Sequence, residues 1–240
     1  MSNKAWTHFV VSLVLGVSLA FVASLRGRSV SAQDVSTGEW SATVEKQESG
    51  INLNFRQSNG VDDSGVRGNR HQFGQTYEFA ELGLTREQVM KGGPVTFALA
   101  REAGTINCKG TFQNGKGSGT FRFTRNPAFV TAMKSRGFDF ESESTGKNHG
   151  RSEDRVFAAA ALNVTTALAD DLTSAGFGKL DVGDLFKAAI FKIDSAFMRE
   201  MKATGFPNMG MEELVKARIF KIDAEFVRQA TQMGFDKETL

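Results

Sequence analysis

The sequence predicts an α+β protein in which an N-terminal antiparallel β region is followed by stacked helical-hairpin repeats. Two observations support this fold class. Apolar and polar residues mostly alternate from Trp40 to Thr124, which is the period of half-buried strands. After Asn126 the apolar spacing becomes helical, and a repeat appears in the sequence. A chain of 240 residues is long enough for one or two small domains of this kind.

The first element is an apolar segment that indicates export. Lys4 precedes an apolar run from Phe9 to Leu25, and the small residues Val30-Ser31-Ala32 follow. This order is typical of a secretory signal cleaved after Ala32. We therefore predict that residues 1–32 are a signal peptide and that the protein is exported, periplasmic or extracellular. The alternative is an uncleaved segment that anchors the protein, since an apolar run of this length approaches the ~20 residues that cross a bilayer.

The charge and ligand counts exclude several classes of protein. The formal net charge is +2, but cleavage would remove Lys4, Arg26 and Arg28 and no acid, which leaves a net charge of −1. A nearly neutral chain lacks the clustered cations that bind nucleic acid. With 3 His and 1 Cys, the chain cannot build a zinc finger or an iron–sulfur site, and we expect no cofactor and no metal. The strand alternation predicts that Cys108 is a buried small side chain.

Residues 33–125 form the predicted antiparallel β domain. The glycine-rich segment 113–119 separates the last two apolar runs and predicts a hairpin, because glycine accepts a positive φ without steric cost. The stretch 57–75 has few large apolar side chains and predicts an exposed loop. Thr85 followed by Gln88 predicts one capped short helix within this region.

Residues 126–240 form the predicted helical repeat region. The pairs Gly176-Phe177, Gly205-Phe206 and Gly234-Phe235 recur every 29 residues. Asp194 precedes a predicted helix as its N-cap, and Gly205 follows it as the C-terminal glycine. Such units bury their apolar stripes mainly against their neighbours, so a short stack of helical hairpins is expected. The predicted units lie near residues 126–138, 155–185, 186–214 and 215–240.

No motif identifies a catalytic site. His-Glu-x-x-His and Gly-x-Ser-x-Gly are absent, and partial matches at residues 110–116 and 144–147 lie in the wrong structural context. An enzyme would need a site without a known motif at the junction of the β region and the helices. Glu102, Asp139 and His71 are the nearest candidates for its acids and bases.

A recurring set of basic residues is the candidate partner-binding surface. Lys192 and Lys221 recur beside the corner between two helices, and Arg199 and Arg228 recur on the helix that follows. We predict that the four residues form a ridge on one face of the stack. The competing interpretation is that they are ordinary solvated charges. The 21 Phe residues, against 1 Tyr and 2 Trp, are expected mainly in the core.

Two helical segments, 186–194 and 196–206, resemble the tandem repeats of uncharacterised exported bacterial proteins. Similar repeats occur in that family behind membrane metallopeptidases of the beta-lactam-sensor type. The β region is also similar to that family, through residues 95–97, 101–105 and 117–121. The resemblance implies an extracytoplasmic protein with a sensing or partner-binding role. It transfers no catalytic residue, because the metallopeptidase motif is absent.

The function expected from the sequence is that of an exported, non-enzymatic module that binds a protein or peptide of the cell envelope. Nucleic acid is not an expected partner, and a membrane is one only if the N-terminal segment stays uncleaved. The alternatives are an extracytoplasmic enzyme with a site at the β–helix junction and a structural module of the envelope.

Overall fold

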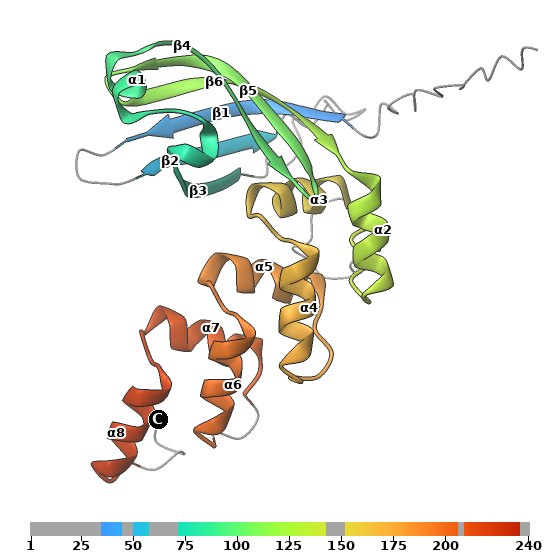
Figure 1. Cartoon of the computed structure of the whole chain (residues 1–240), viewed down its shortest axis with the longest axis vertical. Coiled ribbons are helices and arrows are strands. Elements are labelled where there is room, and N and C mark those ends of the chain that lie inside the picture. Colours follow the sequence, from blue (N-terminus) through green and yellow to red (C-terminus); the bar gives the residue numbers. More distant parts are fainter. Residues whose placement is uncertain (1–34, 45–49, 58–71, 143–151, 206–208, 236–240) are drawn as a thin grey trace, which may run out of the picture. The chain divides into compact units, whose positions relative to one another are not determined.

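The computed structural model describes residues 35–44, 50–57, 72–142, 152–205 and 209–235, and it shows the predicted α+β class (Figure 1). A six-stranded antiparallel sheet comes first along the chain, and the main helices follow it. The predicted signal peptide, most of the predicted loop and His71 lie outside the described residues.

The sheet consists of two three-stranded meanders joined side by side. Its spatial order is β3-β2-β1-β6-β5-β4, and every neighbouring pair is antiparallel. The two meanders join where β1 pairs with β6, from Val35 opposite Thr124 to Thr43 opposite Lys116. The strands are β1 (Val35–Thr43), β2 (Gly50–Gln57), β3 (Gln72–Glu78), β4 (Gly93–Arg101), β5 (Gly104–Gln113) and β6 (Lys116–Arg125).

The alternation in the sequence places one face of the sheet in the core. Ile51, Leu53 and Phe55 of β2 are buried, whereas Asn52 and Arg56 between and beyond them are exposed. The short 3₁₀ helix η2 (Ala80–Leu82) contacts both β3 and β4, which are the opposite edges of the sheet. The sheet therefore curls so that its apolar face lies on the inside.

The last hairpin is confirmed, but its turn is shorter than the glycine-rich segment suggested. Only Asn114 and Gly115 form the turn, with φ of 50° and 77°, and a two-residue turn with two positive φ values suits the twist of a hairpin. Gly117 and Gly119 instead belong to β6. A Cβ atom at Gly119 would lie 2.0 Å from the Lys109 carbonyl oxygen, so this glycine allows close packing of the backbones.

Two smaller predictions in the β region are also confirmed. Thr85 caps helix α1 (Arg86–Lys91) through a capping box, in which its hydroxyl accepts from the Gln88 N–H and the Gln88 side chain accepts from the Thr85 N–H. Cys108 is fully buried, and burial raises the pKa of its thiol to about 12. A thiol in this state is a packing group rather than a nucleophile.

The start predicted at Asp194 and the stop predicted at Gly205 are present, and the other units have equivalent ones. Asn126, Thr165, Asp194 and Asp223 each accept a backbone N–H at the beginning of a helix. A glycine with positive φ follows each of these helices, at positions 137, 176, 205 and 234. The helices are α2 (Pro127–Ser135), α3 (Ser152–Ala161), α4 (Thr166–Ser174), α5 (Val182–Phe191), α6 (Ser195–Ala203), α7 (Met211–Ile219) and α8 (Ala224–Gln232).

The first hairpin of the repeats is packed into the sheet. Residues 155–161 of α3 are all buried, and Phe157 is at the centre of an aromatic cluster. Its ring centroid lies 5.1 Å from that of Phe121 and 5.8 Å from that of Phe55. The Tyr77 hydroxyl donates to the Ala161 carbonyl at 2.7 Å and so satisfies the end of the helix. Sheet and helices therefore share one buried cluster.

The later units contact their neighbours in the repeat. α4 packs on α6, α6 on α8, and α5 on α7, which is the nearest-neighbour arrangement predicted for stacked hairpins. Among the described residues, no helix combines the length and apolar character that a membrane span requires.

Candidate partner-binding surface of the helical repeats

The two recurring lysines lie at corners with a special backbone conformation. Lys192 and Lys221 are exposed and have φ of 53° and 56°, and Asn163 has φ of 55° at the equivalent position of the preceding unit. A left-handed conformation is unfavourable for a residue with a Cβ atom, and asparagine tolerates it best. The corner therefore recurs because the backbone takes the same left-handed conformation in each unit. Asn163, at the equivalent position in the sequence, was the signal for this conformation.

The two recurring arginines are exposed and have local partners. The Arg199 guanidinium donates to the Ser195 hydroxyl at 2.9 Å. Arg228 forms an ion pair with Glu225, which raises the pKa of the guanidinium. That Lys192, Arg199, Lys221 and Arg228 form one ridge stays a prediction, and the charge around Arg228 is mixed because Glu225 pairs with it.

Asp171 links two successive units. Its carboxylate accepts from the Ser195 N–H at 2.8 Å and from the Ser195 hydroxyl at 2.6 Å, at the first residue of α6. These two hydrogen bonds hold the pKa of the Asp171 carboxyl below its usual value. Asp171 is therefore a helix cap that connects one unit to the next.

Basic residues cover aromatic rings of the preceding unit. The Arg218 guanidinium carbon lies 3.7 Å from the ring centroid of Phe197, and its Nη2 donates to the Lys192 carbonyl at 2.8 Å. Lys202 lies 5.3 Å from the ring centroid of Phe177. These contacts were not identified from the sequence, because Arg218 and Lys202 do not recur: the residues 29 positions before them are Ala189 and Thr173.

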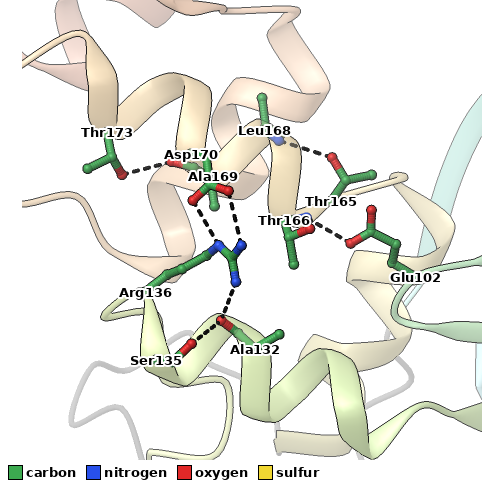
Figure 2. Close-up of polar contacts among 10 residues, drawn as sticks. All are labelled: Glu102, Ala132, Ser135, Arg136, Thr165, Thr166, Leu168, Ala169, Asp170 and Thr173. Atoms are coloured by element: carbon green, nitrogen blue, oxygen red, sulfur yellow. Dashed lines mark hydrogen bonds and ion pairs between the residues drawn. The ribbon is translucent and has the colours of Figure 1, made fainter.

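The junction between the sheet and the helices contains a second group of polar contacts (Figure 2). Glu102, between β4 and β5, accepts from the Thr166 N–H at 2.9 Å and so caps α4. Arg136, at the end of α2, binds both carboxylate oxygens of Asp170 at 2.8 and 3.1 Å. The same guanidinium donates to the Ala132 carbonyl at 2.9 Å.

The acids considered for an enzyme at this junction have structural partners. Glu102 caps a helix, and Asp139 accepts from the Glu141 and Ser142 N–H groups and pairs with Lys134 at 3.1 Å. These bonds hold the pKa of Asp139 below its usual value. Within the described segments, no three His, Cys, Asp or Glu side chains gather as they would around a metal ion.

Large exposed apolar side chains occur from α5 to the end of the described helices. Phe220 is 72% exposed and Met233 is 71% exposed, whereas Ala175, the residue at the position of Met233 two units earlier, is 8% exposed. The expectation that phenylalanines mainly mark the core therefore does not extend to the last unit. The exposed residues in this part of the chain are Ile190, Ile219, Phe220, Phe226, Met233 and Phe235.

No known protein family, curated protein or solved structure matches this chain significantly.

Proposed function

We propose that this protein is an exported, non-enzymatic module that binds a protein or peptide of the cell envelope through its C-terminal repeats. The observation that carries the proposal is the set of six large apolar side chains exposed between Ile190 and Phe235. In this proposal the six side chains contribute to one interaction surface, whose burial against a partner releases water.

The surroundings of these side chains support the same function. Stacked hairpins build an extended surface without a catalytic cleft. The exposed charges of Lys192, Arg199, Lys221 and Arg228 lie on the same repeat units as the apolar side chains. A protein interface usually combines buried apolar side chains with charged residues at its rim.

Export is the part of this proposal that rests on residues 1–32. We expect the protein recovered from the envelope or the medium of its host to begin at Gln33, which N-terminal sequencing would show. A mature protein that keeps Lys4 and stays with the membrane fraction would instead support the anchored form. Recovery from the cytosol would contradict export.

Binding can be tested inside the cell by site-specific photo-crosslinking. A photoreactive amino acid replaces Phe220 in one variant and Thr96, which is exposed on β4, in a matched control. We expect a discrete adduct from position 220 and none from position 96. Equal labelling from both positions would argue against a binding surface on the repeats.

A further inference from the structure

The interfaces between repeat units share a contact in which a cation of one unit covers a ring of the unit before it. Arg218 of α7 lies over Phe197 of α6, and that ring is only 5% exposed. Lys202 of α6 lies over Phe177, which follows α4. Each cation also donates to a backbone carbonyl of the earlier unit, Arg218 to Lys192 at 2.8 Å and Lys202 to Gly176 at 3.4 Å. Each basic side chain thus contacts both an aromatic ring and a backbone carbonyl of the earlier unit.

The same positions of the last described unit are exposed. Phe226 lies 29 residues after Phe197 and is 48% exposed. Phe235 lies two repeat lengths after Phe177 and is 53% exposed. With Met233 they form what we call the terminal face, defined as Phe226, Met233 and Phe235. The repeat register thus identifies this face as the counterpart of surfaces that are covered in the earlier units.

The residue types at these positions indicate what would cover Phe226. At the preceding interface, the positions of Phe197 and Arg218 are occupied by Leu168 and Ala189. At the earlier interface the two positions thus carry an aliphatic residue and an alanine, and at the later interface they carry an aromatic ring and an arginine. Position 226 carries a phenylalanine, as position 197 does. The comparison of the two interfaces therefore favours an arginine over the Phe226 ring, whose quadrupole attracts a guanidinium.

Arg218 and Lys202 of a second copy are not free to cover Phe226. In each copy Arg218 is already bonded to Lys192 and lies on Phe197, and Lys202 is bonded to Gly176. From Asp223 to Phe235 the chain carries two acids and one base, which favours a basic partner. An occupant that brings its own cation would also suit the charge of this segment.

We propose that the terminal face binds a basic amphipathic helix of another polypeptide, which places an arginine over Phe226 and an apolar stripe against Met233 and Phe235. This inference rests on the proposed function and specifies the chemistry of the partner. It gives α7 as the template for that helix, because α7 makes the equivalent contact one unit earlier.

The test uses a synthetic fluorescent peptide with the sequence of residues 209–222, titrated into the full chain and followed by fluorescence anisotropy. We expect saturable binding that weakens about fivefold with Phe226→Ala. The peptide carrying Arg218→Ala should lose the same factor, and the two changes together should lose little more, because both remove one contact. Met90→Ala, which removes an exposed apolar side chain of α1, is the matched control and should leave the affinity unchanged.

Each other outcome contradicts the inference in a recognisable way. Binding that is absent, or insensitive to Phe226→Ala in a variant with unchanged circular dichroism, overturns it. Self-association of the full chain that Phe226→Ala abolishes would make a second copy the occupant and overturn it as well. If the peptide fails while position 220 still gives its specific adduct in cells, only the helix inference fails. If both fail, the proposed function fails too.

Discussion

The sheet and the helical repeats differ in how far along the chain their stabilising contacts reach. In the sheet, β1 pairs with β6, so that Val35 lies opposite Thr124. In the repeats, α6 contacts α4 and α8, the equivalent helices of its two neighbouring units. A sheet whose two halves are joined by pairing of distant strands is expected to unfold as a whole, whereas each unit of a stack is stabilised mainly by its neighbours. The two regions should therefore respond differently to substitutions of similar size.

Burial falls along the helical region. In α3 every residue from 155 to 161 is buried, but in α8 only Val227 and Ala230 are buried. The side chains left uncovered at the far end are apolar, and surface that the fold does not bury is available to a partner. The comparison thus separates a region where aromatic rings are buried in the fold from one where they are exposed.

The largest expected effect is at the point where the two regions meet. Phe157→Ala removes a fully buried ring that packs on Phe55 and Phe121, and we expect a loss of about 3–5 kcal/mol in the free energy of unfolding. Urea unfolding followed by circular dichroism would measure it. Phe226→Ala, at a half-exposed position, should cost much less. Equal losses from the two variants would remove the distinction between the regions.

A smaller effect is expected for the carboxylate that connects two units. Asp171→Asn weakens the cap on α6 and should cost about 1 kcal/mol. The folded-state pKa of Asp171 lies below the unfolded value of about 3.9. The stabilisation by the ionised Asp171 carboxylate is therefore fully present above about pH 3.9, and it is lost as the pH falls through the folded-state pKa.

The pH dependence provides the specific readout for Asp171. Urea midpoints measured between about pH 5 and pH 3 should fall less steeply in Asp171→Asn than in the unsubstituted protein. Parallel pH profiles would show that the carboxylate does not stabilise the stack.

Substitution of a corner lysine by glycine is expected to raise the stability of the protein rather than lower it. Lys221→Gly relieves a left-handed conformation and should stabilise the last unit by about 0.5–1 kcal/mol, after the entropy of glycine in the unfolded chain is counted. Lys216→Gly in the interior of α7 is the matched control and should destabilise by about 1 kcal/mol. Hydrogen exchange of the α7 and α8 amides would report both changes. Destabilisation by both substitutions would mean that the corner conformation is not strained.

The smallest effect is expected at the exposed ion pair of Figure 2. Arg136→Ala removes the pairing with Asp170, and we expect a melting temperature lowered by roughly 2 °C or less, with the difference vanishing at high salt. A large, salt-independent loss would show that α2 and α4 depend on this pair more than exposed pairs usually allow.

Local signals explain why much of the fold was predictable. Asn126, Thr165 and Asp194 act as caps over a few residues, and glycine after a helix acts over one turn, so both can be recognised without tertiary contacts. The buried strand face follows from period two alone. The shortness of the turn at Asn114 was less evident, because the glycines of β6 serve close packing rather than the turn.

The site was less predictable because it depends on contacts between units. Four basic residues were selected by recurrence, but recurrence at Lys192 and Lys221 reflects a backbone conformation shared with Asn163. Arg218, which covers Phe197, was not selected, since its role appears only when α7 packs on the preceding unit. Glu102 was considered as an acid for catalysis, and the structure places it at the N-terminus of α4 as a cap.

The sequence by itself determined the α+β class, the repeat length and the caps of the helices, because these depend on periodicity and on hydrogen bonds between near neighbours. Only the tertiary structure decided which phenylalanines are core and which are surface. Phe197 and Phe226 occupy the same repeat position, yet one is 5% and the other 48% exposed. The physical reason is that burial depends on whether another element covers the ring, and no local pattern contains that information.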